Sequence, residues 1–366
     1  MIILKPQREK PVIQNHPWIF SGAIEKIVGD PQDGDIVNIY DYNGNFLAKG
    51  YLNRKSQITI RILTKNINEE VDKNLFQSRI QNAVNYRNLI IEVEKFDAFR
   101  LIHDAGDLLP GLIVDKYSDY LVVQILTLGI DKRREMIIDI LDDIIKPKGI
   151  YERSDSKVRE KEGLSERSGI IKGTDFSDPI LINQDSVKLL VNLKTGQKTG
   201  AFLDQRENLK LVASYSQNRD VLDCFCYTGS FSIYASIGGA RSVLGVDNSE
   251  EALEIAYDNA KLNDVQGICQ FVKDDAFNFL NSCDRKFDMI ILDPPSFSKS
   301  DRDIKNAARA YKHINMSAMK MLNKDGILVT FSCSYHIDPL LFRKIVFSAS
   351  VDAKCDLRIM HILHAS

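Results

Sequence analysis

The sequence contains little cysteine, and its cysteines are not spaced as in a metal site. Six cysteines and six histidines are scattered over 366 residues, and no pair of cysteines forms a C-x-x-C motif. This pattern fits neither the disulfide framework of a small secreted protein nor a zinc site. We therefore expect reduced thiols that mostly pack in hydrophobic cores, and no bound metal.

Long apolar runs and an excess of charge of one sign are also missing. No run reaches membrane-spanning length, and the first ten residues lack the apolar core of a signal peptide. The 48 basic residues nearly balance the 50 acidic ones, so any nucleic-acid partner must be bound by a local patch. We expect a cytoplasmic protein with no membrane partner.

The chain starts with an all-β pattern. At 366 residues it is too long for one hydrophobic core, which predicts two or three domains. Short strand-like runs separated by turn residues predict a small β-barrel over residues 1–68. These runs lie at 35–41, 46–52 and 57–63.

A mixed unit is predicted for residues 69–185. Apolar residues recur at helical spacing from Leu75 to about Leu89. The polar run 154–169 predicts a loop. Further strands are expected at 99–103, 112–117 and 120–126, followed by a helix at 131–145.

Residues 186–366 are predicted to form a doubly wound α/β domain. A strand-like run at 187–193 comes first, and strands alternate strictly with helices from Gln205 onward. Such alternation is typical of a parallel sheet covered by helices on both faces. Ligands of these sheets bind at the carboxyl ends of the strands, where the strand order reverses.

The first strand of this alternation, 221–223, ends in a turn with a single glycine. A dinucleotide enzyme needs G-x-G-x-x-G for its backbone to approach a pyrophosphate, and the missing pattern argues against NAD or FAD. S-adenosylmethionine has no phosphate, so one glycine can suffice. The strand end and turn supply the candidate cofactor-binding residues Asp223, Phe225, Tyr227, Thr228 and Gly229.

Acidic residues also end the next two strands. Asp247 follows Asp223 by 24 residues, near the spacing at which a carboxylate binds ribose hydroxyls. Asp275 is a candidate acceptor for the adenine amino group. Helix capping is the alternative for each acid, and Ser249 can cap the following helix as well. Three successive strand ends favour a cofactor cleft, lined by Asp247, Asn248, Asp274 and Asp275.

Two further strand ends carry a carboxylate and a thiol. The apolar run 287–292 precedes Asp293, and the run 326–331 leads to Cys333. Both runs are typical of fully buried parallel strands. If these strands are neighbours in one sheet, Asp293 and Cys333 lie side by side at its carboxyl edge.

The segment from Asp293 to Phe297 suits recognition of a base. Pro294 and Pro295 lack amide hydrogens and stiffen the backbone, which leaves carbonyl acceptors for an exocyclic amino group. Asp293 can hydrogen-bond the ring edge, and Phe297 can stack on the ring. A rigid turn between strand and loop is the alternative.

A thiol beside a carboxylate suits carbon methylation of cytosine. C5 is not nucleophilic enough until a thiolate adds to C6. Cys333 is the candidate nucleophile and Asp293 assists protonation at N3, while Lys299 or His336 is a candidate for favouring the thiolate. The alternative for Cys333 is a buried apolar role. We assign two other cysteines at this edge, Cys224 and Cys226, to packing.

A row of basic residues follows the Asp293 loop. Four of them are spaced by three, four and three residues, which places them on one helical face. Such a row can bind RNA phosphates, and a solvated helix face is the alternative. The row comprises Lys299, Arg302, Lys305, Arg309 and Lys312.

At these residues the chain resembles the large-subunit ribosomal RNA methyltransferase I family of cytosine-C5 enzymes. The similarity spans nearly the whole chain and is most specific at 196–206, 224–231, 293–297 and 331–334. It implies an N-terminal PUA domain that binds RNA, a central α/β domain and a Rossmann-like class I methyltransferase domain. It also implies ribosomal RNA as partner, a homodimer, Cys333 as nucleophile, and a cofactor enclosed by Thr199, Phe202, Gln205 and Arg206.

The chain departs from this family at its end. Family members continue past the position of His364 through an Asp-His-Pro segment and a closing strand. That antiparallel strand inserts between the strand ending at Cys333 and one near 357–363. Without that strand, the sheet edge lacks backbone partners. We therefore expect a truncated, less stable and less active product unless another chain fills the gap.

Three functions are compatible with the sequence. The leading interpretation is an S-adenosylmethionine-dependent RNA cytosine-C5 methyltransferase. Alternatively, the segment from Asp293 to Phe297 serves an N-methyltransferase acting on an RNA purine, whose amino lone pair needs no thiol. A third interpretation is an RNA-binding protein with impaired catalysis. Replacing Cys333 separates the two enzymes, because only carbon methylation depends on the thiol.

Overall fold

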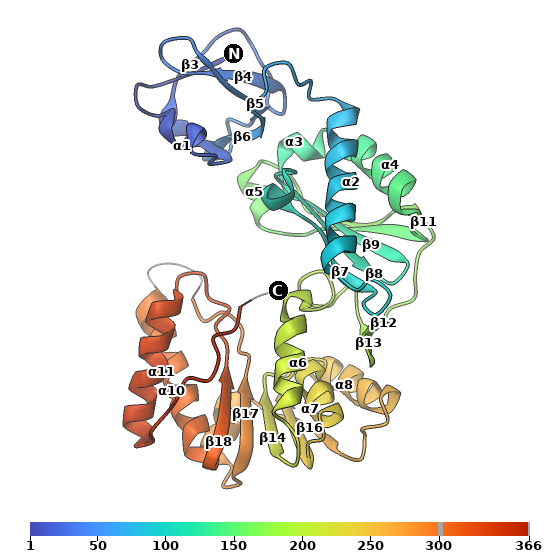
Figure 1. Ribbon diagram of the computed structural model, residues 1–366, viewed down its shortest axis with the longest axis vertical. Coiled ribbons are helices and arrows are strands. Elements are labelled where there is room, and N and C mark those ends of the chain that lie inside the picture. Colours follow the sequence, from blue (N-terminus) through green and yellow to red (C-terminus); the bar gives the residue numbers. More distant parts are fainter. Residues whose placement is uncertain (299–302, 365–366) are drawn as a thin grey trace. The chain divides into compact units, whose positions relative to one another are not determined.

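The computed structural model describes residues 1–298 and 303–364, and its chain divides into two compact units (Figure 1). Unit 1 comprises Met1–Asn183 and Asn192–Ala201, and unit 2 comprises Gln184–Val191 and Phe202–Ser366. The chain thus passes between the units three times, at 183/184, 191/192 and 201/202. The strands β12 (Ile180–Gln184) and β13 (Val187–Val191) lie next to the first of these points. The finer division of unit 1 at residue 68 stays a prediction.

Unit 1 begins with the predicted all-β fold, a six-stranded sheet in the order β2-β6-β5-β4-β1-β3. All its pairs are antiparallel except that of β1 with β4. Alternate side chains point into one small core that contains Ile2, Leu4, Ile39 and Ile60. The strands are β1 (Ile2–Leu4), β2 (Trp18–Phe20), β3 (Ile24–Ile27), β4 (Ile36–Tyr40), β5 (Phe46–Leu52) and β6 (Ile58–Thr64), with the short helix α1 (Lys10–Ile13) between β1 and β2.

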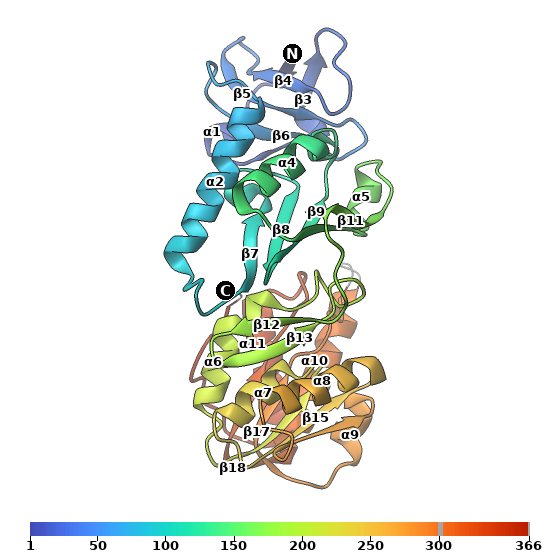
Figure 2. The same cartoon turned by 90° about the vertical axis from the view of Figure 1, so that its right-hand side faces the viewer.

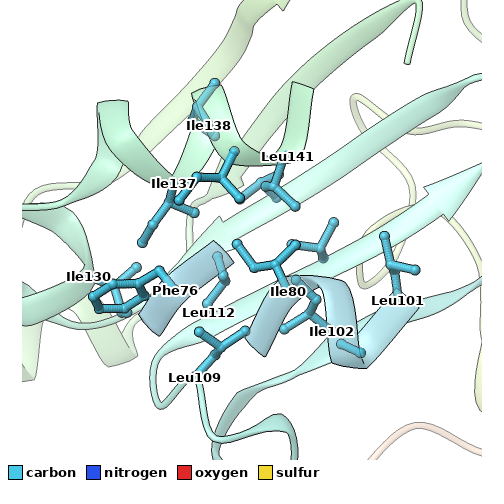
Figure 3. Packing of buried hydrophobic residues seen from close by; sticks show 14 of the residues in the cluster. Phe76, Ile80, Leu101, Ile102, Leu109, Leu112, Ile130, Ile137, Ile138 and Leu141 are labelled. Carbon is cyan, nitrogen blue, oxygen red and sulfur yellow. The ribbon is translucent and has the colours of Figure 1, made fainter. Parts of the chain in front are cut away.

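The rest of unit 1 is a five-stranded sheet in the order β11-β10-β9-β8-β7, packed against α2 (Lys73–Ile90) and α4 (Arg134–Ile145). Asp72 starts α2 by accepting a hydrogen bond from the Leu75 amide (3.1 Å). Figure 3 shows apolar side chains of both helices meeting those of the strands. The strands are β7 (Ala98–His103), β8 (Leu112–Tyr117), β9 (Tyr120–Ile125), β10 (Gly149–Ser154) and β11 (Arg167–Gly173), and α3 (Leu128–Asp131) precedes α4.

The prediction of a loop over 154–169 is wrong in part. This run contains α5 (Val158–Lys161) and the start of β11. Arg159 is fully buried and donates hydrogen bonds to the Ile125 carbonyl and to the Asp131 carboxylate. A polar composition predicts solvent exposure, whereas here buried acceptors from distant segments hold the polar side chains in ordered structure.

Unit 2 is the predicted doubly wound fold, a parallel sheet in the order β16-β15-β14-β17-β18. Strand order reverses between β14 and β17. Figures 1 and 2 show α6, α7 and α8 on one face and α10 and α11 on the other. The strands are β14 (Asp220–Cys224), β15 (Ser242–Asp247), β16 (Cys269–Lys273), β17 (Phe287–Leu292) and β18 (Leu322–Thr330). The helices are α6 (Arg206–Ser214), α7 (Ser230–Ile237), α8 (Glu250–Leu262), α9 (Ala276–Ser282), α10 (Ile304–Met321) and α11 (Pro339–Ala353).

The strand expected near 357–363 is not formed. Residues 355–364 carry no helix or strand, and β18 is the last strand of its sheet in the described part of the chain. The resemblance placed a further strand between β18 and this segment. Residues 357–363 are therefore irregular in this structure, and the prediction of a strand there is wrong.

Candidate active site

The turn after β14 lies at the point where the strand order reverses. Phe225 and Tyr227 adopt positive φ values of 64° and 49°, and Gly229 has φ 79° before α7 begins. A Cβ at Gly229 would lie 3.0 Å from the Ala256 Cβ and 3.2 Å from the Phe271 ring. The glycine therefore permits a tight turn against neighbouring side chains.

Asp223, at the end of β14, is fully buried. One of its oxygens accepts a hydrogen bond from the Ser232 hydroxyl (2.7 Å), while Oδ1 has no hydrogen-bond partner among the described residues. Burial raises the pKa of Asp223 to about 7, and the nearby carboxylates of Asp293 and Asp247 contribute to the increase. This unpaired acceptor fits a ligand that brings hydrogen-bond donors and positive charge, as S-adenosylmethionine does.

The other candidate acids are partly engaged by local backbone. Asp247 accepts hydrogen bonds from the Tyr227 amide (2.9 Å) and the Ser249 amide (3.0 Å), which ties the turn after β14 to the end of β15. Ser249 caps α8, and Asn248 is exposed. Asp275 caps α9 and its amide donates to Asp274, so its capping interpretation is confirmed. Cofactor binding by Asn248, Asp274 and Asp275 stays a prediction.

The segment before α6 reaches the same sheet edge in unit 2. The Phe202 and Tyr227 rings meet edge-on, with centroids 5.9 Å apart. Gln205 donates a hydrogen bond to Oδ2 of Asp293 (3.4 Å), a contact across 88 residues that no local pattern signals. Arg206 forms an ion pair with Glu207 at 3.0 Å.

Thr199 belongs to unit 1. Its buried hydroxyl donates to Asp115 (2.6 Å) and is hydrogen-bonded to the Tyr117 hydroxyl (2.9 Å). Arg153 also donates to the Gly196 carbonyl in the same segment (2.7 Å). A cofactor role for Thr199 stays a prediction.

The predicted pairing of carboxylate and thiol is present. Strands β17 and β18 are parallel neighbours, and the Phe331 amide donates to the Leu292 carbonyl (2.9 Å) just beyond their paired residues. The Cys333 thiol is exposed, and its Sγ lies 3.8 Å from Oδ1 of Asp293. The two groups therefore face each other at the carboxyl edge of the sheet.

The other cysteines at this edge have a different environment. Cys224 and Cys226 are buried, and burial holds the pKa of both thiols well above the ordinary value. At the opposite, amino end of β16, burial also raises the pKa of Cys269, to about 11. Since the thiolate is the reactive form, these three thiols are disfavoured as nucleophiles.

Ser334 joins the two loops that carry Asp293 and Cys333, and the sequence pattern did not predict this role. Its buried hydroxyl bonds with the Tyr311 hydroxyl (2.9 Å) and the Ser296 hydroxyl (3.1 Å), and accepts from the Ser298 amide (3.4 Å). A Ser after Cys333 has no sequence signal for this role. The network fixes the loop of Asp293 against the segment that carries the thiol.

The residues proposed to bind a base have mixed exposure. Pro294 is buried and Pro295 is exposed. Phe297 packs against the Tyr311 and Phe277 rings, with centroid distances of 4.7 and 5.7 Å. Base stacking by Phe297 stays a prediction.

The basic row is only partly on a free surface. Lys305 and Arg309 are exposed on α10, whereas Lys312 forms an ion pair with Asp352 of α11 at 2.7 Å. Lys299 and Arg302 lie outside the described residues. Phosphate binding by this row, Lys312 included, stays a prediction.

Grouped metal ligands and membrane-spanning helices are both absent from the described part of the chain. Within residues 1–298 and 303–364, no three His, Cys, Asp or Glu side chains are grouped as a metal site requires. Over the same residues, no helix is both long enough and apolar enough to cross a membrane. The His336 ring meets the Tyr335 ring edge-on, with centroids 5.4 Å apart. That His336 favours the thiolate of Cys333 stays a prediction.

Two protein families and several solved structures match this chain. Residues 2–65 match the PUA-like domain family, and residues 174–347 match the S-adenosylmethionine-dependent methyltransferase family. A candidate methyltransferase, SMU.776, solved in complex with SAH, has a TM-score of 0.81 at 20% identity, covering 95% of this chain and 90% of that one. A candidate SAM-dependent methyltransferase from Streptococcus mutans has a TM-score of 0.80 at 21% identity over the same shares. These structures establish the fold.

Curated relatives are more similar in sequence. The ribosomal RNA large subunit methyltransferase I of Aeromonas hydrophila subsp. hydrophila is 43% identical over 99% of this chain and 92% of its own length. The Escherichia coli O157:H7 protein of the same name is 39% identical over 98% of this chain and 92% of its own length. With this identity over nearly its whole length, the chain belongs to the ribosomal RNA large subunit methyltransferase I family, whose members use S-adenosylmethionine.

Proposed function

We propose that this protein transfers a methyl group from S-adenosylmethionine to C5 of a cytosine in large-subunit ribosomal RNA. The observation that carries the proposal is the exposed Cys333 thiol 3.8 Å from the Asp293 carboxylate, at the carboxyl edge of a methyltransferase sheet. An enzyme that methylates an exocyclic nitrogen needs an acceptor for the amino group but no thiol. Methylation at C5 of cytosine needs both the carboxylate and the thiol, because the ring carbon must first be activated by covalent addition at C6.

The cofactor is proposed to bind across the ends of β14 and β15. Asp223 contributes the unpaired buried oxygen, Asp247 the carboxylate at the second strand end, and Phe202 and Tyr227 a pair of rings. When bound there, S-adenosylmethionine supplies the electrophilic methyl group that C5 takes, and leaves as S-adenosylhomocysteine. Gln205, which bonds to Asp293, links this region to the reacting groups.

The chain's own residues move one proton and form one transient bond. The Cys333 thiol passes its proton to Asp293, and the sulfur adds to C6 of the cytosine. Asp293 transfers that proton to N3, which neutralises the charge that addition places on the ring. After C5 has taken the methyl group, a base removes the C5 proton and the bond between C6 and sulfur breaks. N3 then returns its proton, which restores the aromatic ring and the free thiol.

The test is methyl transfer to large-subunit ribosomal RNA followed by nucleoside analysis. Cys333→Ala should reduce formation of 5-methylcytosine by at least about 10³-fold, the scale seen when a nucleophile is removed. Cys355→Ala, which removes a half-buried thiol after α11, is the matched control and should retain activity. A methylated purine formed equally well by Cys333→Ala would contradict the proposal and favour nitrogen methylation.

A second measurement detects the covalent step itself. RNA containing 5-fluorocytidine carries no C5 proton to lose, so the bond between sulfur and C6 cannot break after methylation. Wild type and Cys355→Ala should form a protein–RNA adduct that survives denaturing electrophoresis. Cys333→Ala should form none. Asp293→Asn keeps the shape of the side chain but cannot carry the thiol proton, so its adduct should form more slowly.

A further inference from the structure

The two oxygens of the Asp293 carboxylate face different groups. Oδ1 lies 3.8 Å from Sγ of Cys333, and Oδ2 accepts a hydrogen bond from Nε2 of Gln205 (3.4 Å). In the proposed mechanism the thiol proton therefore passes to Oδ1, the oxygen that faces the sulfur. The N–H group at Oδ2 needs an acceptor there, so it favours the orientation of the carboxylate that keeps Oδ1 toward the thiol.

The Gln205 side chain bonds to the loop of Asp293 instead of capping its own helix. Gln205 stands at the N-terminal cap of α6, and its side chain forms no capping hydrogen bond there. It ends a short 3₁₀ turn, η3 (Leu203–Gln205). Asn208 follows three residues later, in the first turn of α6. Side chains three residues apart lie on one face of a helix, which brings the two amides together.

Asn208 sets which end of the Gln205 amide faces Asp293. Its Nδ2 donates to Oε1 of Gln205 (2.6 Å). An amide has a donor end and an acceptor end, and a half-turn exchanges them. Because Asn208 occupies the acceptor end, the donor end is turned to the carboxylate. The same Nδ2 donates to the His364 carbonyl (3.3 Å), and a carbonyl and an ionised carboxylate can only accept, so one assignment of both amides satisfies all three contacts.

The position of Asn208 is unusual for a polar residue. It is 5% exposed and shares the buried face of α6 with Leu209 and Val212. A buried amide costs free energy unless it is hydrogen-bonded, and an apolar side chain would pack on that face without this cost. The bond to Gln205 therefore points to a role in the site rather than in packing.

We propose that Asn208 is a positioning residue for the proton transfer from Cys333 to Asp293, and that it acts through the Gln205 amide. During this step the S–H bond breaks and an O–H bond forms at Oδ1, while the sulfur electron pair forms the bond to C6. The N–H group of Gln205 stays hydrogen-bonded to Oδ2 throughout, so the carboxylate does not turn. The inference rests on the proposed function in one respect, that Asp293 takes the thiol proton.

Asn208→Asp keeps the shape of the side chain and replaces the donor by an acceptor. Oε1 of Gln205 then meets a carboxylate, which favours the reversed amide and puts a carbonyl oxygen against Oδ2 of Asp293. At saturating RNA and S-adenosylmethionine, the single-turnover rate of 5-methylcytosine formation should fall by about 10-fold to about 100-fold, the cost of misplacing a reacting group. RNA affinity should stay at the wild-type value, since a positioning role affects the chemical step rather than binding.

Asn263→Asp is the matched control. Nδ2 of Asn263 donates to the backbone carbonyls of Lys188 (2.6 Å) and Asn259 (2.7 Å). The substitution removes a donor of the same kind from unit 2, at the end of α8 rather than beside Gln205. It should lower the stability in chemical denaturation and leave the single-turnover rate unchanged.

A double-mutant cycle shows whether Asn208 acts through Gln205. Gln205→Ala removes the amide that Asn208 orients. In that background Asn208→Asp should slow methyl transfer no further, although it slows the wild type. An equal fold-reduction in both backgrounds would overturn the proposal, because it would mean that Asn208 only supports the fold.

Asn208→Leu keeps the inference testable if Asn208→Asp does not fold, which circular dichroism detects. Leucine fills a buried site of similar volume without a donor, so it should also slow the reaction in the wild type and not in Gln205→Ala. Wild-type rates in both Asn208 variants would overturn this inference and leave the proposed function intact if 5-methylcytosine still forms. A wild type that forms no 5-methylcytosine would instead overturn the proposed function, and the inference with it.

Discussion

At the scale of single residues, Asp223 is fully buried, and its Oδ1 has no hydrogen-bond partner among the described residues. Burial and the nearby carboxylates raise its pKa to about 7, from an ordinary value near 4. The folded protein thus keeps the proton over a pH range in which the unfolded chain has lost it. The resulting stability is present below about pH 4 and is lost as the pH rises to about 7.

Asp223→Asn should remove this pH dependence because the amide cannot ionise. The wild type is expected to lose on the order of 2 to 4 kcal/mol of stability between pH 4 and pH 8 from this group, since a tenfold change in an ionisation constant corresponds to about 1.4 kcal/mol. Urea unfolding at pH 4 and at pH 8 measures the difference. A variant whose stability depends on pH as steeply as the wild type would show that Asp223 is ionised in the folded state.

At the scale of structural elements, a buried ion pair joins β6 to the segment after α5 in unit 1. Arg61 Nη2 lies 2.9 Å from Oε1 of Glu162, and both side chains are almost fully buried. Asn53 donates to the other oxygen of Glu162 (2.8 Å). The pair therefore links the first sheet of unit 1 to the polar run that composition alone predicts to be a loop.

Glu162→Gln should destabilise the protein by about 3 to 5 kcal/mol because it leaves the Arg61 charge buried without compensation. The control is Asp258→Asn, which breaks an exposed pair with Lys261 (2.9 Å). Such surface pairs contribute little, so the control should stay within about 1 kcal/mol of wild type. Chemical denaturation with matched variants gives both numbers. Equal effects of the two substitutions would mean that water reaches Glu162 in solution.

At the scale of the whole molecule, each unit has its own buried core. The cores that contain Leu112 and Ile39 belong to unit 1, and the core that contains Tyr311 and Ile290 belongs to unit 2. The cofactor residues proposed at the ends of β14 and β15 all lie in unit 2. A ligand bound there stabilises the unit that it contacts and not the other.

Calorimetric unfolding should therefore show two transitions, one for each unit, since a chain of two compact units with separate cores departs from two-state behaviour. S-adenosylhomocysteine at about 100 times its Kd should stabilise the transition of unit 2 by about 2.7 kcal/mol and leave the other in place. Glu162→Gln should lower only the transition of unit 1. A single cooperative transition, shifted as a whole by S-adenosylhomocysteine and by Glu162→Gln alike, would contradict the division into two units.

Much of the site could be predicted from local pattern. The apolar runs ending at Leu292 and Thr330 have the length and composition of buried parallel strands, and parallel strands end at one edge. On the condition that the two strands are neighbours in the sheet, this predicted that Asp293 and Cys333 lie side by side. The contact of Gln205 with Asp293 and the hydrogen bonds of Ser334 could not be predicted, because they depend on side-chain directions between loops far apart in the chain.

Two predictions about elements were wrong for a related reason. Composition measures how polar a segment is, but not which partner it meets. The run 154–169 is polar and yet holds the buried Arg159, and the segment 357–363 is rich in apolar residues and yet forms no strand. For Arg159, acceptors at Ile125 and Asp131, distant in the sequence, decided the outcome.

The sequence by itself determined the alternation of strands and helices, the single-glycine turn after Asp223 and the order of the reactive strand ends, because these depend on residue spacing along the chain. The tertiary structure decided that Cys333 is exposed while Cys224 is buried, that burial raises the pKa of Asp223, and that Trp18 and Phe20 stand outside the core. Burial, and the pKa changes that follow from it, arise from neighbours distant in sequence. No local pattern contains that information.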